Sequence, residues 1–136
     1  MAEFYRKTHC VSHYQIDILS KGALMSEGGA GGTLARFSPG QINVATAWDG
    51  DGTVPPLVEI SMSGFNPIPA AGIEGLIPIA LGTFEAGEDG VEVGNFITSD
   101  VSAVALAKGR YNVTVFLDKV EPMAARKVHF HFTAAA

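Results

Sequence analysis

The chain has 136 residues, of which 47% are hydrophobic, and a formal net charge of −5 at pH 7. This length and composition argue against a disordered chain and predict a single domain, residues 1–136, that buries about two thirds of its unfolded surface. The acidic balance disfavours direct binding to nucleic acid, because the phosphate backbone is also negative, and it suits a basic partner.

The sequence carries no sign of secretion or of membrane insertion. Residues 1–7 lack the apolar core of a secretory signal. The longest apolar run, from Leu76 to Leu81, is too short to cross a bilayer and is interrupted by Pro78. Cys10 is the one cysteine, which excludes an intrachain disulfide and agrees with a reducing compartment. We therefore expect a cytoplasmic protein without membrane attachment.

Alternation of apolar and polar residues predicts strands from the N-terminus onward. The first is expected from Thr8 to Leu19, with Gln15 and Asp17 on a face turned to water. A glycine-rich loop over 20–32 follows, and then a short strand over 33–37 that ends at a turn over 38–40. Strands over 41–48 and 57–62 are predicted to pair as a hairpin around Asp49-Gly50-Asp51-Gly52.

The second half of the chain repeats this pattern after an irregular connection over 63–75. A strand is expected over 76–84, where Pro78 indicates an edge or a bulge, and further strands over 91–97 and 100–107. The clearest strand covers 108–118, and the last covers 127–132. Their predicted inward residues are Tyr111, Val113, Val115, Leu117, Val128, Phe130 and Phe132.

These segments make about nine strands, with turn residues between them and no helix pattern of ten residues or more. Such regular spacing is typical of a sandwich or a barrel. The sequence therefore predicts an all-β fold, a two-sheet antiparallel β-sandwich with little or no helix.

The histidines suggest one candidate metal site. His129 and His131 share one face of the last strand, and this spacing lets both rings reach one metal ion. His9 and His13 would supply a third ligand if the first and last strands pair. The alternative is that these histidines are exposed polar positions of two strands, because no carboxylate in either short motif completes a ligand set. Beyond this candidate, no cofactor is expected.

No motif for catalysis is evident. The loop that begins at Asp49 has Ile60 where a calcium-binding loop needs a bidentate Glu. The glycine run at 28–32 lacks the Lys-Ser/Thr ending of a phosphate-binding loop. Cys10 has His9 and His13 nearby, but a lone cysteine in a strand is more typical of a small buried hydrophobe than of an activated thiol. We expect no enzymatic activity.

Two parts of the chain resemble the competence protein J family, whose known member inhibits a DNA-entry nuclease. The first is Val11–Ile18, and the second runs from Asp89–Val93 through Val101–Leu106 into Lys108–Val115, which has the pattern Lys-Gly-x-Tyr-x-Val-x-Val. The order, the spacing and the total length agree with the family. The resemblance implies a β-sandwich that binds a protein, possesses no catalysis of its own, and has a nuclease as its partner.

An acidic inhibitor can occupy the basic cleft of a nuclease and gain association rate from long-range attraction. Because the resemblance supplies no interface motif, the candidate partner-binding residues come from the acidic loops, whose alternative interpretation is solvated turns. They are Asp49, Asp51, Glu85, Glu88 and Asp89.

Two other functions stay open at this point. One is a small-molecule or metal-binding sandwich that uses the histidines of the terminal strands. The other is a structural subunit that self-associates through exposed strand edges. Some apolar residues exceed what the inward faces need and mildly favour a homodimer. They are Phe65, Ile68, Ile73, Phe96 and Phe116.

Overall fold

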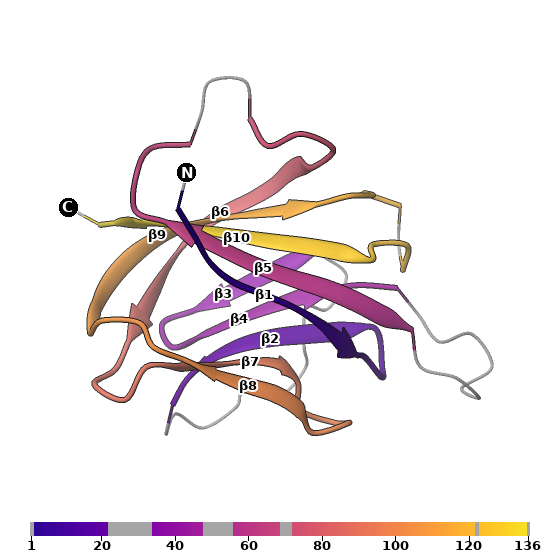
Figure 1. Ribbon diagram of the computed structural model, residues 1–136, viewed down its shortest axis with the longest axis horizontal. Coiled ribbons are helices and arrows are strands. Elements are labelled where there is room, and N and C mark those ends of the chain that lie inside the picture. Colours follow the sequence, from indigo (N-terminus) through magenta and orange to yellow (C-terminus); the bar gives the residue numbers. More distant parts are fainter. Residues whose placement is uncertain (1, 22–33, 48–55, 69–71, 122, 136) are drawn as a thin grey trace.

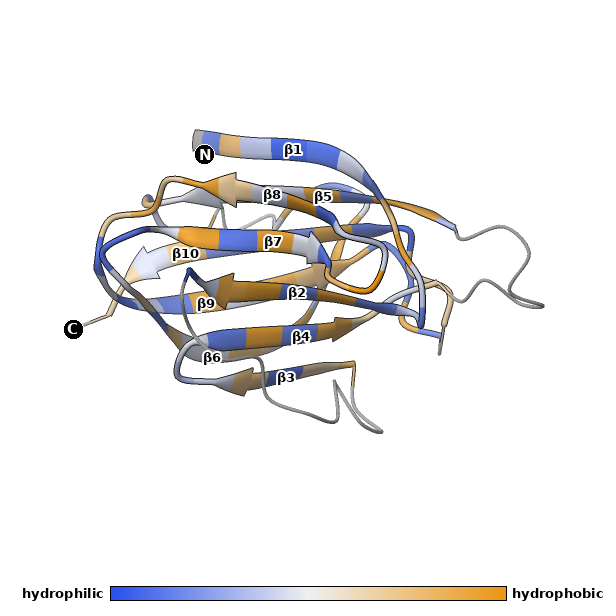
Figure 2. Cartoon of the chain, turned by 90° about the horizontal axis from the view of Figure 1, so that it is seen from below, coloured by the Kyte–Doolittle hydropathy of each residue, from blue (hydrophilic) through white to orange (hydrophobic). Residues whose placement is uncertain are grey.

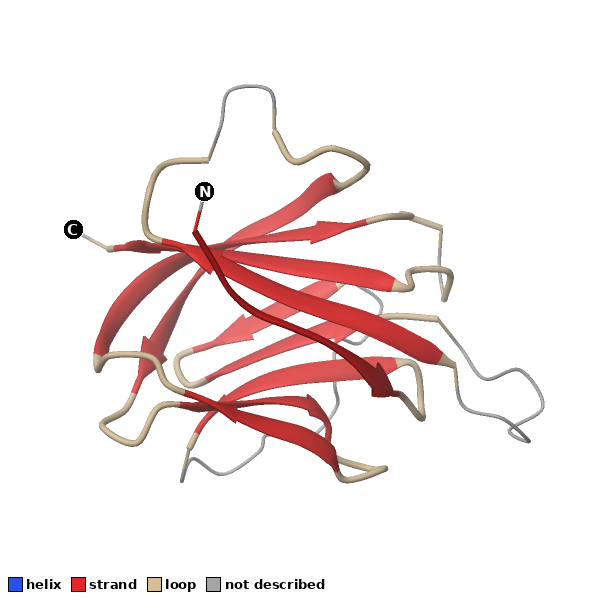
Figure 3. Ribbon diagram, viewed as in Figure 1, coloured by secondary structure: helices blue, strands red, loops and turns tan. Residues whose placement is uncertain are grey.

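The computed structural model describes residues 2–21, 34–47, 56–68, 72–121 and 123–135, which form ten strands and no helix (Figure 3). No helix that could cross a membrane therefore occurs in these ranges. Sheet A has the strand order β1 (Ala2–Cys10), β5 (Leu57–Gly64), β10 (Lys127–Ala134), β9 (Gly109–Leu117) and β6 (Ile77–Ala86). Sheet B has the order β3 (Ala35–Ser38), β4 (Gln41–Ala45), β2 (Gln15–Ser20), β7 (Val91–Asn95) and β8 (Asp100–Val104).

The two sheets lie over one another as the layers of a sandwich (Figure 1). Neighbouring strands pair antiparallel, except that β5 and β10 run parallel. The predicted all-β sandwich is therefore confirmed, with one parallel pair inside sheet A. A parallel pair cannot be joined by a tight turn. Its two strands accordingly come from distant parts of the sequence, residues 57–64 and 127–134.

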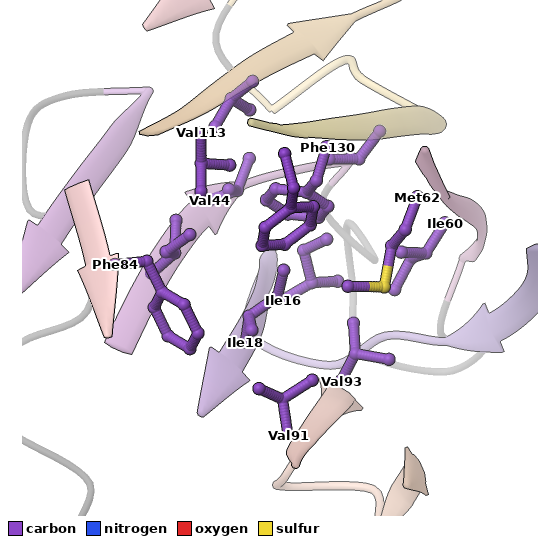
Figure 4. Close-up of a cluster of buried hydrophobic side chains, with 14 of the residues drawn as sticks. Ile16, Ile18, Val44, Ile60, Met62, Phe84, Val91, Val93, Val113 and Phe130 are labelled. Atoms are coloured by element: carbon purple, nitrogen blue, oxygen red, sulfur yellow. The ribbon is translucent and has the colours of Figure 1, made fainter. Parts of the chain in front are cut away.

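Apolar side chains from both sheets fill the space between the layers (Figure 4). Ile16 and Ile18 of β2 meet Ile60 and Met62 of β5 and Phe130 of β10, and all five are fully buried. Burying a side chain of this size stabilises the fold by about 1.5–3 kcal/mol. The inward residues predicted for the last two strands are confirmed, and none of them is more than 7% exposed. Hydrophobic and hydrophilic residues alternate along several strands, as Figure 2 shows.

Both sides of the sandwich are closed by contacts between edge strands. On one side, Lys7 of β1 donates to Ser102 of β8 across 3.3 Å. On the other side, the ring of Phe37 in β3 packs on Gly82 of β6 so closely that a Cβ there would lie 2.4 Å from the ring. The edge strand β6 also has an irregular register between Pro78 and Ala80, which confirms the position predicted for this proline.

The single strand predicted from Thr8 to Leu19 is wrong. Strand β1 ends at Cys10 in sheet A, and β2 begins at Gln15 in sheet B. Between them the chain turns through His13 and Tyr14, which have φ angles of 61° and 45°. These left-handed conformations, unusual for residues other than glycine, break the extended backbone. The face expected to meet water is also buried, since Asp17 is only 4% exposed.

The hairpin predicted over residues 42–62 is also wrong. Strand β4 lies in sheet B and pairs with β2 and β3, whereas β5 lies in sheet A and pairs with β1 and β10. The Asp-Gly signal predicted a turn but did not contain the information that the chain changes sheets there. Pairing depends on contacts with distant strands, which local turn chemistry cannot specify.

Candidate protein-binding site

The outer face of sheet A carries a buried polar cluster. His129 and His131 of β10 stand beside Ser61 and Ser63 of β5 in the parallel register. The two histidines are 2% and 1% exposed, so the expectation of exposed histidines is wrong. The reason is tertiary: the described residues of the β5–β6 connection, 65–68 and 72–76, lie on this side of the sheet, with Asn66 bonded to His131 and residues 73–76 beside His129 (Figure 1).

Four hydrogen bonds join these side chains into what we call the Ser–His network. Ser61 Oγ lies 2.6 Å from His129 Nδ1, and Ser63 Oγ lies 2.6 Å from His129 Nε2. Ser63 Oγ also lies 2.7 Å from His131 Nδ1, and His131 Nε2 lies 2.7 Å from the carbonyl oxygen of Asn66. Each ring nitrogen therefore has a partner, as buried polar groups require.

The carbonyl of Asn66 sets the direction of the whole network when both rings are neutral. A carbonyl only accepts, so His131 Nε2–H must donate to it and His131 Nδ1 must accept from the Ser63 hydroxyl. The Ser63 oxygen then accepts from His129 Nε2–H, and His129 Nδ1 accepts from the Ser61 hydroxyl. Burial lowers the pKa of His129 to about 4, which keeps this ring neutral near pH 7.

The network bears directly on the metal prediction for His129 and His131. A metal ion would have to displace hydrogen bonds that already occupy the ring nitrogens. Within the described ranges, no group of three or more His, Cys, Asp or Glu side chains could hold a metal ion. The proposed third ligand does not arrive either, because β5 lies between β1 and β10.

His9 belongs to a separate site between the two sheets. It is fully buried, and its Nδ1 lies 2.9 Å from both the carbonyl and a carboxylate oxygen of Asp100 in β8. Its Nε2 is hydrogen bonded to the Tyr5 hydroxyl. In a neutral His9 ring, Nδ1–H donates to Asp100, so Nε2 accepts from the Tyr5 hydroxyl, whose pKa is raised by burial. Asp100 also accepts from the backbone N–H of Cys10, a half-buried residue at the end of β1. These contacts attach the end of β1 to β8 of sheet B.

Three of the predicted partner-binding residues come together at one end of the sandwich. Glu85, near the end of β6, and Glu88 and Asp89, in the connection from β6 to β7, are all exposed, and we call these three residues the acidic turn. Glu88 and Asp89 border an open groove of about 370 Å³ whose other side is formed by residues 105–107. Cations lie close by: Lys108 pairs with Glu88 at 3.3 Å, and Arg110 stands opposite Glu85 in the β6–β9 register.

The other two predicted residues, Asp49 and Asp51, lie outside the described residues. The described neighbours of their segment are at the opposite end of the sandwich from the acidic turn (Figure 1). Pro56 accepts a hydrogen bond from Val11, and Ala47 donates to Ala125. The acidic turn instead adjoins Lys21, which donates to Gly90. The five residues are therefore not shown to form one patch.

Sequence reasoning missed Ser61, Ser63 and Asn66. Ser61 and Ser63 alternate with inward-facing residues of β5, as His129 and His131 do in β10, so a Ser-x-Ser and a His-x-His motif carried the signal. The signal could be recognised only with the knowledge that these two strands are neighbours. The contribution of Asn66 has no sequence signal, because it comes from a backbone carbonyl.

Comparisons with known proteins agree with this architecture. No protein-family model and no curated protein matches the chain. Its fold resembles the crystal structure of ComJ from Bacillus subtilis, described as an inhibitor of the DNA degrading activity of NucA. The TM-score is 0.64 over 98% of this chain and 97% of that chain, at 13% sequence identity. The likeness confirms the resemblance to the competence protein J family at the level of the fold.

Proposed function

We propose that this protein binds another protein and inhibits it, and that the target is a nuclease. The observation that carries the proposal is the fold shared with the NucA inhibitor ComJ along almost the whole of both chains. The net charge of −5 adds support, because a nuclease that grips DNA presents a basic surface to the phosphate backbone. Fold alone does not determine function, so an inhibition assay has to decide.

The acidic turn at Glu85, Glu88 and Asp89 is the proposed first contact with the basic surface of the nuclease. All three carboxylates are exposed and lie at the end of the sandwich, where a cleft can reach them. Lys108 and Arg110 offset part of their charge, since charges interact over a screening length of about 8 Å in physiological salt. We therefore expect the turn to act mainly on the association rate.

The assay titrates the purified protein into a nuclease that degrades DNA, with NucA and the related nucleases of the native host as targets. The expected result is a stoichiometric loss of DNA degradation and a complex that elutes as one species in size-exclusion chromatography. Full activity of every nuclease in the presence of excess protein, with no complex formed, would contradict the proposal.

The contribution of the turn is tested separately with the triple variant Glu85→Gln, Glu88→Gln, Asp89→Asn. We expect association to slow about tenfold at low salt while the dissociation rate changes little, since long-range attraction acts on encounter. A variant with Glu121→Gln is the control, because Glu121 is an exposed acidic residue in the β9–β10 connection. Equal association rates for all three proteins would remove the turn from the interface.

A further inference from the structure

A pocket of about 230 Å³ opens on the outer face of sheet A, directly above one end of the Ser–His network. Ser61 and His129 border it from β5 and β10, and residues 73–76 of the β5–β6 connection border it from the other side. Pockets for drug-sized ligands measure about 300–1,000 Å³. This one therefore has the size for a single side chain rather than for a nucleotide or a cofactor.

The Ser–His network determines whether Ser61 offers a hydrogen-bond donor or an acceptor to the pocket. With both rings neutral, the Asn66 carbonyl directs the donors, so the hydrogen of Ser61 points at His129 Nδ1 and is not available to the pocket. Ser61 is 4% exposed, and its oxygen retains unused lone pairs. It can therefore accept a hydrogen bond from a donor that fills the pocket.

The charged groups around the pocket also favour a hydrogen-bond donor that carries positive charge. Glu3, Glu59, Glu74 and Asp118 border it with four carboxylates, whereas its cations are Arg6 and Lys127. Arg6 is engaged with Glu3 at 2.6 and 2.8 Å and with Glu59 at 2.5 Å.

Glu74 differs from the acidic residues that Arg6 binds. It is exposed, and no ion pair joins it to another residue of the described ranges. The pocket thus combines surplus negative charge with surplus acceptors, and Lys127 is its one cation that is not already engaged by a carboxylate in the described part of the chain.

We propose that this pocket receives the guanidinium group of an arginine side chain from the protein partner. A guanidinium has five N–H donors in a planar fork, so it can bind a carboxylate such as Glu74 and donate to the Ser61 oxygen at once. Nucleases that bind DNA carry exposed arginines for phosphate contacts, and an inhibitor that captures one removes it from the substrate. The source of the arginine rests on the proposed function, whereas the chemistry of the pocket does not.

In the first experiment, N-acetyl-arginine amide is the probe and is titrated into the purified protein. Binding is measured by NMR from the signals of the histidine rings and the backbone amides. Saturable shifts centred on His129 and residues 73–76 are expected. N-acetyl-citrulline amide is the matched control, because it has nearly the same shape and no charge. The affinity of the citrulline compound should be at least about tenfold lower, which is the size of effect expected when a charge-assisted hydrogen bond is lost.

Two variants in the pocket and one control variant outside it localise the probe. Glu74→Gln lies on an exposed part of the chain where folding is not at risk, and it should weaken probe binding about tenfold. Glu121→Gln removes the same charge outside the pocket and should leave binding unchanged. Ser61→Ala, tested for folding by the dispersion of its amide spectrum, should also weaken binding. No saturable binding, equal binding of the citrulline probe, or equal binding to Glu74→Gln and wild type would overturn the proposal.

A second arm separates this inference from the proposed function. If a nuclease is inhibited and the Glu74→Gln variant inhibits as well as wild type, the pocket proposal is overturned while the inhibitor function stands. If the probe binds but no nuclease is inhibited, the guanidinium comes from a free small molecule, and the assignment to a partner's arginine is overturned. Weaker inhibition by Glu74→Gln, with Glu121→Gln unaffected, supports both.

Discussion

Strand β10 of sheet A buries side chains on both of its faces, but the two faces are built from different chemistry. The inner face packs Val128, Phe130 and Phe132 of β10 against the residues of sheet B. The outer face of the same strand carries His129 and His131, which are equally buried but hydrogen bonded to serines. One strand of alternating residues therefore contributes to an apolar core on one side and to a polar network on the other.

The difference teaches how each face contributes to stability. Apolar burial stabilises in proportion to area, and it tolerates a partial loss with a partial cost. A buried polar network contributes little net free energy when every group has a partner, but leaving one group without a partner is costly. The inner face should thus dominate the total stability, whereas the outer face should respond to single atoms and to pH.

The largest effect is expected from truncating the inner face. Phe130→Ala should lower the free energy of unfolding by about 3–5 kcal/mol, because Phe130 is fully buried and leaves a cavity. Phe116→Ala, on the outer face, should cost less, about 2–3 kcal/mol, because its ring packs beside His129 and outside the apolar cluster between the sheets. Urea denaturation measures both, with Leu81→Ala as an exposed control. A cost below about 1 kcal/mol for Phe116→Ala would show that the outer face is not packed.

The next effect is a pH dependence confined to the outer face. The pKa of His129 is lowered from its ordinary value to about 4 by burial and, to a lesser degree, by the charges of His131 and Arg6, while Glu3 opposes the shift. The unfolded chain therefore binds a proton at this residue near pH 6.5, and the folded chain does not. The contribution of His129 to the free energy of unfolding should be fully present above pH 6.5. It should fall by about 2–3 kcal/mol as the pH decreases to 4.

Subtracting the pH profile of a His129→Gln variant isolates this contribution. The subtraction is needed because burial raises the pKa of Asp17, which has the opposite effect on stability across the acidic range. Parallel profiles for wild type and His129→Gln between pH 4 and 6.5 would contradict the buried, neutral state of this ring.

A smaller effect is expected from removing one hydroxyl group. Ser63→Ala leaves His129 Nε2 without an acceptor and His131 Nδ1 without a donor, which should cost about 1–3 kcal/mol. Ser61→Ala should cost less, because it removes one hydrogen bond to one ring. Denaturation with urea ranks the two variants, and the reverse order would show that Ser63 does not connect the rings.

The smallest effect is expected at the rim of the outer face, which is formed by the exposed ion pairs of Arg6 in β1. Arg6→Gln breaks ion pairs with Glu3 and Glu59, but half of the Arg6 side chain is exposed. Water and salt screen such pairs, so the change in stability should stay below about 1 kcal/mol and shrink further in high salt. A larger loss that is insensitive to salt would mean that the rim, and not the buried network, holds the outer face together.

The sequence was sufficient to predict most strands, because alternation is a local property. Apart from Phe116, the apolar side chains of residues 109–117 and of residues 127–134 lie on one face of their strand wherever that strand is placed. The same reasoning failed between Thr8 and Leu19, where the alternation continues but the chain turns through His13 and Tyr14 and changes sheets. Of the candidate site residues, Glu85, Glu88 and Asp89 are found together because they are close in sequence, and His129 and His131 share one face of β10 as the alternation predicted.

By itself, the sequence determined an all-β fold, the inward face of each clear strand and an acidic surface. Only the tertiary structure decided that β5 and β10 are parallel neighbours, which places Ser61 and Ser63 beside His129 and His131. It also decided that the β5–β6 connection lies above this face and supplies the Asn66 carbonyl that directs the network. The physical reason is range: side-chain alternation depends on residues two positions apart, whereas strand pairing and loop placement depend on the packing of the whole chain.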